Sequence, residues 1–361
     1  MRARIEQALH REWSRKGLFS LAMWPLSRLY GAAVAHRKQR FQRDPSRVHH
    51  ETIPVVVVGN IFVGGTGKTP VVIALTQALE ARGWQPGIIS RGYGVKPGDT
   101  PLIGQGGLDP AQFGDEPALI AAQTQAPVCV HPDRQAAVRR LRRQYPKVDV
   151  VISDDGLQHL ALGRDLEIVV QDARGTGNGF LLPAGPLREP ATRLESVDFI
   201  VNNLLALDSP APSPVGMTRV VNMSLQPEAV EHLLTGEKVT WHEWLKLHQH
   251  ERCAAVAAIG RPERFFRMLH QHGLNLVNTL SLPDHYGYES APFQAFNTEC
   301  ILLTPKDAVK CRKFADARLY CVHPGPVFSD PAWLDLVHDM LSAISELKLT
   351  SVNAEALNSR F

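Results

Sequence analysis

The chain has 361 residues, of which 44% are hydrophobic and 21% are charged. A chain of this length and composition can bury one large core or two modest ones, and it is not expected to be disordered. The cysteines lack C-x-x-C spacing, so the sequence predicts neither a disulfide framework nor a zinc site, and a reducing compartment fits best. They are Cys129, Cys253, Cys300, Cys311 and Cys321.

The net charge of +3 conceals a strong asymmetry between the beginning of the chain and the rest. Residues 1–50 contain eleven Lys/Arg and three Asp/Glu, a net +8, which leaves the other 311 residues at −5. The same segment carries Trp13, Phe19, Trp24, Leu26 and Tyr30. A basic segment with aromatic and apolar side chains predicts a surface that is attracted to anionic lipid headgroups.

Three other interpretations of this segment remain open. Residues 17–35 are numerous enough for a transmembrane helix, but Pro25 and Arg28 lie inside, and a mid-membrane arginine costs roughly 2.5–3.5 kcal/mol. A secretory signal would be cleaved near Ala33-Val34-Ala35, although Arg28 interrupts that apolar run as well. The third is an amphipathic helix that covers the protein's own core. Of the four, we expect interfacial membrane binding.

From Ile53 onward, short β-branched runs alternate with helical patterns. The runs expected to form strands are Val55–Val58, Gly87–Ser90, Val148–Ser153, Leu166–Gln171 and Val197–Asn202. They are apolar on both faces, which is typical of a parallel sheet covered by helices on each side. The predicted fold class is therefore α/β, with a parallel sheet sandwiched by helices.

A second series of strands and helices follows a proline-rich connector at Leu207–Val215. Its expected elements are strands at Ala254–Ile259, Cys300–Thr304 and Leu319–Val322 and a helix at Pro262–His272. This series predicts a second, smaller α/β lobe. Pro331–Leu347 has the pattern of a closing amphipathic helix, and Lys348–Phe361 is expected to be frayed.

The strongest chemical signal is a glycine-rich turn between a buried strand and a helix, Val55-Val-Val-Val-Gly-Asn-Ile-Phe-Val-Gly-Gly-Thr-Gly-Lys-Thr-Pro70. Its glycines let backbone N–H groups approach phosphate oxygens, and the helix N-terminus adds its positive end. Lys68 is expected to meet the β- and γ-phosphates of ATP, and the Thr69 hydroxyl to hold Mg²⁺. The predicted nucleotide-binding residues are Gly64, Gly65, Thr66, Gly67, Lys68 and Thr69.

This turn departs from G-x-x-x-x-G-K-[ST], because Phe62 stands where the first glycine is expected. The alternative is a glycine-rich strand–helix turn without a phosphate role. A second element, Val148-Asp-Val-Val-Ile-Ser-Asp-Asp-Gly156, is a hydrophobic strand that ends in two carboxylates. Asp154 and Asp155 are therefore candidate Mg²⁺ ligands at the carboxyl end of a strand, unless they belong to a solvated turn.

With these motifs, the chain resembles the tetraacyldisaccharide 4′-kinase family of lipid A biosynthesis from about Leu18 to Cys321. The motifs that carry the resemblance are Val58-Gly-Asn-Ile61, Val63-Gly-Gly-Thr-Gly-Lys-Thr-Pro70, Ser90-Arg-Gly-Tyr-Gly94, Gly114-Asp-Glu-Pro117, Asp154-Asp-Gly-Leu-Gln-His159, Leu182-Pro-Ala-Gly-Pro-Leu-Arg-Glu-Pro190, Ile259-Gly-Arg-Pro262, Arg264-Phe-Phe266, Pro283-Asp-His285 and Lys306-Asp-Ala-Val-Lys-Cys311. Phe62, Leu157 and Pro305 depart from the family pattern, and Phe62 leaves open the path of the loop.

The resemblance implies an enzyme that transfers the γ-phosphate of ATP to the 4′-hydroxyl of an acylated glucosamine disaccharide 1-phosphate, giving lipid IVA. It implies a P-loop NTPase-type fold, with ATP and Mg²⁺ as cofactors. The implied location is the cytoplasmic face of the bacterial inner membrane, as a peripheral or monotopic protein. The expected partners are this lipid substrate and the membrane surface, with no nucleic acid.

The resemblance also assigns roles to individual residues. Asp115 would be the base that takes the proton of the sugar hydroxyl, with Glu116 beside it, and His285 would orient that base. From the residues alone, Asp115 could instead be a helix N-cap, and His285 a loop residue. Second-rank candidates for substrate or phosphate contacts are His159, Arg188 and Glu189, with Arg91 and Arg134 after them. The alternative for Arg188 and Glu189 is a surface ion pair.

The expected organisation has four parts: a basic amphipathic membrane-associating segment at 1–50, a P-loop kinase domain at 51–225, a smaller α/β lobe at 226–330 that closes over the site, and a C-terminal helix and tail at 331–361. The alternative function is a membrane-associated P-loop switch or partitioning ATPase, which would hydrolyse ATP without an acylated acceptor. Val63 counts against it, because that class carries a lysine there. A soluble kinase or ligase for a small metabolite is the third possibility, which the basic N-terminal segment disfavours.

Overall fold

The computed structural model describes residues 9, 12–92, 95, 98–205, 218–284 and 286–358, without the side chains of 352–358. Its contacts divide the chain into two compact units. The larger is built mainly from Glu6–Asn203 and Phe328–Phe361, and the smaller mainly from Ser224–Val327. The predicted division into four parts stays a prediction, and each unit is described by itself below.

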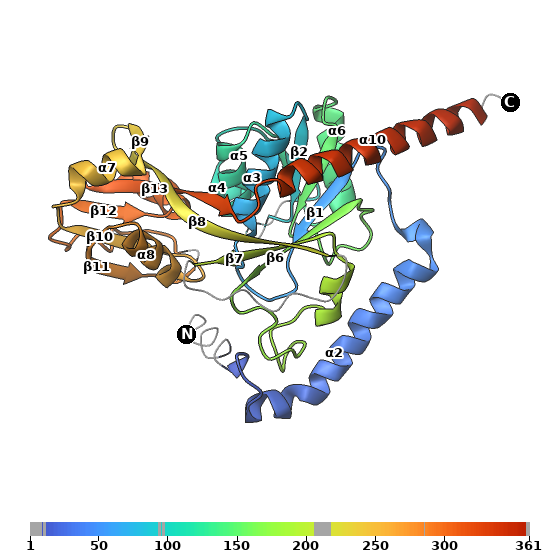
Figure 1. Cartoon of the computed structure of the whole chain (residues 1–361), viewed down its shortest axis with the longest axis horizontal. Helices are drawn as coiled ribbons and strands as arrows, with labels where there is room; N and C mark the ends of the chain where they lie inside the picture. Colours follow the sequence, from blue (N-terminus) through green and yellow to red (C-terminus); the bar gives the residue numbers. More distant parts are fainter. Residues whose placement is uncertain are drawn as a thin grey trace. The chain divides into compact units, whose positions relative to one another are not determined.

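The larger unit contains a sheet in the order β7-β6-β1-β5-β2-β4-β3 (Figure 1). Its strands are β1 (Val55–Gly59), β2 (Pro86–Ser90), β3 (Leu102–Gly104), β4 (Val128–Val130), β5 (Val150–Asp154), β6 (Leu166–Asp172) and β7 (Phe199–Leu204). All neighbouring strands run parallel except β3, which is antiparallel to β4. All five β1 residues are buried, as expected of a β-branched strand covered on both faces.

The helices of this unit are α2 (Leu18–Arg43), α3 (Lys68–Ala81), α4 (Pro110–Phe113), α5 (Asp115–Gln123), α6 (Arg134–Gln144) and α10 (Trp333–Asn358), with the 3-10 helices η1 (Pro45–Arg47) and η2 (Ala191–Ser196). Val55 and Val57 of β1 share one core cluster with Val138 and Leu141 of α6. Helix α3 contacts β1, β2 and β5. The prediction of an α/β fold with a parallel sheet between helices is confirmed.

The parallel strands bring several polar residues to one edge of the sheet. Val58, near the end of β1, pairs with Asp154 at the end of β5. On the other side, Asp172 at the end of β6 pairs with Asn203 of β7. Since ligands of open α/β sheets bind at the carboxyl ends of the strands, this edge is the place to look for the site.

The smaller unit has its own strands, in the order β11-β10-β12-β13-β8, with β9 beside β8. They are β8 (Arg219–His232), β9 (Lys238–Thr240), β10 (Cys253–Ala257), β11 (Leu276–Ser281), β12 (Cys300–Leu303) and β13 (Leu319–Phe328), and the helices are α7 (Trp241–His248), α8 (Pro262–Gln271), α9 (Pro305–Cys311) and η3 (Arg312–Phe314). Trp244 of α7 and Phe265 of α8 pack in one cluster with alternate strand residues. Tyr288 and Phe293 pack with α9 in the other cluster.

One predicted detail differs from the structure, and another lies outside the described residues. The C-terminal helix begins at Trp333 and continues to Asn358, so the prediction of a frayed segment from Lys348 is wrong for most of that segment. The Lys348 ammonium, at the start of that segment, donates to the carbonyl oxygens of Glu51 and Ile53. The predicted connector Leu207–Val215 lies outside the described residues.

Helix α2 is attached to its unit by small polar side chains. The Ser27 hydroxyl donates to the Leu181 carbonyl at 2.8 Å and accepts from the Ala184 N–H at 2.9 Å. The Tyr30 hydroxyl donates to the Arg188 carbonyl at 3.2 Å. The buried residues of α2 are Ser20 and Ser27. The helix therefore does not bury an apolar face against the protein's own core, as one of the alternatives proposed.

The leucines of α2 are instead exposed, with 87% of Leu18 and 69% of Leu29 accessible to solvent and Leu21 and Leu26 exposed as well. Figure 1 shows α2 in blue as one long helix. No helix in the described part of the chain combines the length and apolarity needed to cross a membrane.

Replacing Ser27 by alanine is expected to lower the free energy of unfolding of the larger unit by about 1–3 kcal/mol, because the buried Ala184 N–H loses its partner. Denaturant titration followed by tryptophan fluorescence measures this loss. The matched control is Ser46→Ala, whose hydroxyl bonds Asp44 in an exposed turn, and it should stay within about 0.5 kcal/mol of the parent. Equal effects of the two variants would contradict the role assigned to Ser27.

Candidate active site

The glycine-rich turn lies between β1 and α3, as the sequence predicts. Gly64 and Gly67 have φ values of 100° and 89°, in the left-handed region that favours glycine. Gly67 is the N-cap of α3, so Lys68 and Thr69 are the first two residues of that helix. Gly64 and Gly65 are exposed, which leaves their backbone N–H groups accessible to a phosphate.

Two asparagines hold the turn in shape. The Asn60 amide donates to the Gly64 carbonyl at 3.1 Å and to the Thr66 hydroxyl at 3.2 Å. The Asn203 amide donates to the Thr66 carbonyl at 3.0 Å. A Cβ on Gly67 would lie 2.0 Å from this amide nitrogen, so only glycine fits. The loop is therefore preorganised by the protein's own side chains.

Phe62, the departure from the family pattern, lies away from the phosphate path. Its ring is buried in the core cluster with Leu187. The Arg174 guanidinium carbon lies 4.2 Å from the ring centroid, and the same side chain donates to the Gly65 carbonyl at 2.8 Å. Asp172 accepts from Arg174 at 2.7 Å. Phe62 thus serves as a platform for an arginine that fixes the loop, a cation–π arrangement.

Lys68, Asp155 and Arg188 form a charged cluster beside the loop. Asp155 Oδ1 lies 3.4 Å from Lys68 Nζ and 2.8 Å from Arg188 Nη2. Arg188 also donates to Asn60 Oδ1 at 2.7 Å. Burial disfavours the charged form of Asp155, but the Lys68 and Arg188 charges outweigh it and hold the pKa of that carboxyl below its usual range. Asp155 adopts a φ of 49°, which is uncommon outside glycine and turns its carboxylate into the cluster.

Asp154 lies at the end of β5 and is almost completely buried. Its Oδ2 accepts from the Ser90 hydroxyl at 3.0 Å, while its Oδ1 has no hydrogen-bond partner among the described residues. Burial raises the pKa of Asp154 to about 6, the Glu116 carboxylate adds to the rise, and Lys68 opposes it. Arg134, a second-rank candidate, donates to the Asp154 carbonyl at 2.9 Å. A buried carboxylate oxygen with no partner is what a cation site requires.

Asp115 and Glu116 occupy the first turn of α5. The N-cap of this helix is Gly114, so the alternative in which Asp115 caps the helix is wrong. The Glu116 carboxylate helps to raise the pKa of Asp154, which indicates that the start of α5 lies near the candidate metal ligands. His285 lies outside the described residues. Its predicted role stays a prediction.

His159 and Glu189 lie among arginines. Burial lowers the pKa of His159 to about 4, and the Arg134 guanidinium adds to the drop, so this imidazole is neutral at neutral pH. Glu189 accepts from Gln158 at 2.7 Å and pairs with Arg193 at 3.4 Å. The alternative of an Arg188–Glu189 ion pair is therefore wrong, because each residue pairs elsewhere.

A cavity of about 570 Å³ lies between α2 and the segment that carries Arg188 and Glu189. Its wall includes the cationic side chains of Arg37, Lys38 and Arg193, and apolar residues such as Phe41 and Leu160. Arg188 belongs both to this wall and to the cluster with Asp155 and Lys68. The cavity and the phosphate loop thus share one charged residue.

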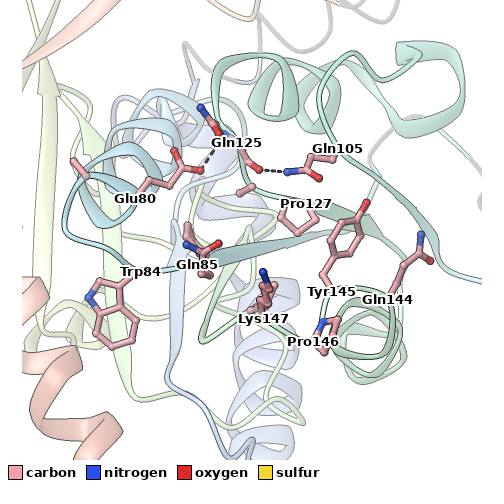
Figure 2. Close-up of a pocket in the computed structure, with 14 residues that line it drawn as sticks. Glu80, Trp84, Gln85, Gln105, Gln125, Pro127, Gln144, Tyr145, Pro146 and Lys147 are labelled. Atoms are coloured by element: carbon pink, nitrogen blue, oxygen red, sulfur yellow. Dashed lines mark hydrogen bonds between the residues drawn. The ribbon is translucent and has the colours of Figure 1, made fainter.

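A second pocket, shown in Figure 2, has a volume of about 580 Å³ and lies at the other edge of the sheet. Its residues include Pro86 at the start of β2, Pro127 just before β4 and Val148 just before β5. Since these strands are parallel, the pocket lies at their amino ends. It is therefore separate from the edge where the phosphate loop leaves β1.

Comparison with known proteins identifies the family. A family model described as LpxK, tetraacyldisaccharide-1-P 4′-kinase, matches residues 19–342. The chain belongs to this family. A tetraacyldisaccharide 4′-kinase of Bordetella parapertussis is 49% identical over 339 residues, covering 94% of this chain and 97% of the relative. One of Bordetella petrii is 50% identical over 328 residues, covering 90% and 92%. The chain is therefore an enzyme of the kinase class.

A solved structure agrees with this assignment. The apo form of LpxK from Aquifex aeolicus, described as in complex with ATP, has a TM-score of 0.75 and 26% sequence identity to this chain. The similarity covers 90% of this chain and 100% of that one. The P-loop kinase fold predicted from the sequence is confirmed.

Sequence reasoning missed the residues that hold the family's phosphate loop in place here. Asn60 lies within a motif used for the resemblance but had no role assigned to it. Asp172, Arg174 and Asn203 lie at the carboxyl ends of β6 and β7 or just beyond, the position that drew attention to Asp154 after β5. Applying the same rule to every strand end would have found them.

Gly67→Ala is expected to lower the free energy of unfolding by about 2–3 kcal/mol without any nucleotide, because the new Cβ displaces Asn203 and strains a left-handed residue. Gly65→Ala is the matched control, since its Cβ would meet nothing within 4 Å. Thermal and denaturant unfolding of the nucleotide-free proteins measure the difference. Similar losses in both variants would show that the close approach of Asn203 does not restrict Gly67.

Proposed function

We propose that this enzyme transfers the γ-phosphate of ATP to the 4′-hydroxyl of tetraacyldisaccharide 1-phosphate, giving lipid IVA in lipid A biosynthesis. One observation carries the proposal beyond the family match. Arg188 joins the phosphate loop, through Asp155 and Lys68, to a cationic cavity beside α2. A kinase for a phosphorylated lipid needs both a nucleotide site and a cationic acceptor site within reach of each other.

ATP binds at the preorganised turn. The N–H groups of Gly64 to Thr69 face its phosphates at the start of α3, and the Lys68 ammonium exchanges its contact with Asp155 for the β- and γ-phosphates. As the chain supplies this cradle before binding, little reorganisation is needed. Arg174 keeps the Gly65 carbonyl turned away from the phosphates by holding it in a hydrogen bond.

The residues at the carboxyl end of β5 fit Mg²⁺. Asp154 offers a buried oxygen that lacks a partner among the described residues, and hard carboxylate oxygens are what this cation prefers. Asp154, Asp155 and Thr69 would hold the ion, directly or through water. When bound, it neutralises charge on the β- and γ-phosphates. A bound cation also favours the ionised form of Asp154, whose pKa burial otherwise raises to about 6.

The acceptor lies in the cavity beside α2. Arg37, Lys38 and Arg193 provide charges for the substrate's 1-phosphate, and Arg188 is positioned where the cavity meets the phosphate loop. Asp115 takes the proton of the 4′-hydroxyl, and His285 orients this base, as the family resemblance implies. Glu116 lies beside the base. The neutral imidazole of His159 and the carboxylate of Glu189 accept hydrogen bonds from the lipid substrate.

The switch or partitioning ATPase is not favoured, since the match to a kinase family extends over residues 19–342. Such an ATPase would turn over ATP without an acylated sugar. The requirement for an acceptor therefore separates the two functions experimentally.

The purified protein, assayed with ATP, Mg²⁺ and tetraacyldisaccharide 1-phosphate in detergent, is expected to form a bisphosphorylated lipid. Lys68→Ala should lower kcat by about 10²–10³-fold, because it removes charge stabilisation at the transferring phosphate. Lys147→Ala, at the opposite edge of the sheet, is the matched control and should retain activity. Thin-layer separation of radiolabelled product measures both. ATP hydrolysis that does not depend on the lipid would contradict the kinase assignment.

We also propose that α2 holds the enzyme at the cytoplasmic face of the inner membrane without crossing it. Its polar contacts attach it to the larger unit, whereas Leu18, Leu21 and Leu29 remain exposed. Basic side chains of the same helix, including Arg28 and Lys38, would lie near anionic headgroups. Each contributes about 1 kcal/mol, which salt screens.

The triple variant Leu18→Gln/Leu21→Gln/Leu29→Gln is expected to bind anionic vesicles at least about tenfold more weakly, since each leucine contributes about 1.5–3 kcal/mol when buried in lipid. The control is Leu347→Gln/Leu349→Gln, which changes exposed leucines of α10, the other long helix. Co-sedimentation with vesicles at increasing salt measures binding. High salt should release much of the parent protein, and complete resistance to salt and alkaline carbonate would contradict a peripheral attachment.

A further inference from the structure

The smaller unit contains a cluster of metal-binding side chains that the kinase reaction does not use. His248 is the last residue of α7, Glu251 and Cys253 follow at the start of β10, and Cys300 begins β12. Strands β10 and β12 are parallel neighbours, and their register places Cys253 opposite Cys300. The two thiols therefore lie on the same side of the sheet, next to the end of α7.

The donor atoms of this cluster converge. His248 Nδ1 lies 2.7 Å from Glu251 Oε2 and 3.5 Å from Cys300 Sγ. Cys300 Sγ lies 2.9 Å from Glu251 Oε2. The Cys253 thiol donates instead to the His248 carbonyl oxygen at 4.0 Å. One nitrogen, one carboxylate oxygen and one sulfur, of His248, Glu251 and Cys300, thus lie within 4.8 Å of one another.

These separations suit a tetrahedral zinc ion. Zinc bonds of about 2.3 Å to sulfur and about 2.0–2.1 Å to nitrogen place the two atoms about 3.5 Å apart in a tetrahedron. That is the Cys300–His248 separation. The carboxylate is nearer than a zinc ligand would be, and it would move outward by about half an ångström on binding. Glu251 can do so, because its side chain is 37% exposed.

The remaining ligands are held in place before any metal arrives. The His248 ring stacks on Trp244, with a centroid distance of 4.6 Å, and packs against Tyr320 at 5.3 Å. Its Nδ1 is thereby directed at the cluster. Cys300 is buried in a strand, whereas Glu251 lies at the rim, so a cation has a path from solvent.

A second cluster, of Glu231, Cys321 and His323, provides a contrast. There the Glu231 carboxylate forms an ion pair with the Arg312 guanidinium as well as a 2.9 Å contact with His323. The arginine charge competes with a cation for the carboxylate. Among the described residues Glu251 forms no ion pair with Lys or Arg, and its carboxylate contacts His248 and Cys300.

We propose that His248, Glu251 and Cys300 bind one Zn²⁺ ion, which links the end of α7 and the turn after it to strand β12. Cys300 coordinates as the thiolate and the imidazole through Nδ1, and the thiol proton passes to the buffer. The site supplies three of the four tetrahedral positions and leaves the fourth to water. It belongs to the smaller unit and is independent of the phosphate loop.

The test is metal binding by the full-length protein. The chain, purified under reducing conditions and dialysed against trace Zn²⁺, is expected to retain one zinc per molecule by elemental analysis. Replacement by Co²⁺ should give the strong visible absorption and thiolate charge-transfer bands of tetrahedral sulfur coordination. Adding Zn²⁺ to the metal-free protein should raise its Tm, because a ligand that binds only the folded state stabilises it.

Matched variants locate the site. Cys300→Ala should lose zinc, the cobalt spectrum and the Tm shift, whereas Cys311→Ala, an equally buried cysteine in the other core cluster of this unit, should keep all three. Glu251→Gln, at the exposed rim, should weaken zinc affinity by at least about tenfold while leaving the fold intact. This variant keeps the test decisive even if Cys300→Ala does not fold.

Three results would overturn the proposal. One is the absence of stoichiometric zinc in the parent protein after dialysis. Another is equal zinc retention by the parent, Cys300→Ala and Glu251→Gln, which would place the metal elsewhere. The third is a Cys253–Cys300 disulfide found by mass spectrometry in protein kept under reducing agent, since a disulfide leaves no Cys300 thiolate to coordinate.

Discussion

The carboxylate of Asp155 is the centre on which the active site depends. It lies between the Lys68 ammonium and the Arg188 guanidinium and so connects the glycine-rich loop to the wall of the cavity proposed for the acceptor. Its left-handed backbone makes this geometry possible immediately after a buried strand. Since the two cations hold its pKa low, the carboxylate stays ionised and keeps both charges in place while the nucleotide site is empty.

Much of the larger unit could be predicted because its signals are local. The valine run of β1 and the glycines after it specify strand, turn and helix without help from distant residues. Strand β8 was missed because Pro227 lies within it, and β4 because Val128–Val130 is too short to stand out. Their existence depends on neighbours that the sequence does not reveal, and periodicity alone cannot supply those neighbours.

The same distinction applies to the sites. Lys68 and Asp154 belong to motifs that can be recognised in the sequence. Asn203 and Arg174 instead act through contacts with loop carbonyls more than a hundred residues away. The proposed zinc ligands show this most clearly. Glu251 and Cys300 are 49 residues apart, so no spacing rule connects them, and the parallel pairing of β10 with β12 brings them together.

Two different kinds of interaction act on the two sides of α2. Its inner side is held by hydroxyl groups such as Ser27, which bond to backbone atoms in a buried position, while its leucines face outward. A detergent micelle competes for apolar surface but gains nothing from a buried hydrogen bond. If α2 binds lipid as proposed, detergent can therefore release the enzyme with α2 still docked, and the wall that the helix contributes to the cavity is kept. The proposed membrane attachment and the formation of the cavity are in this sense chemically independent properties of the same 26 residues.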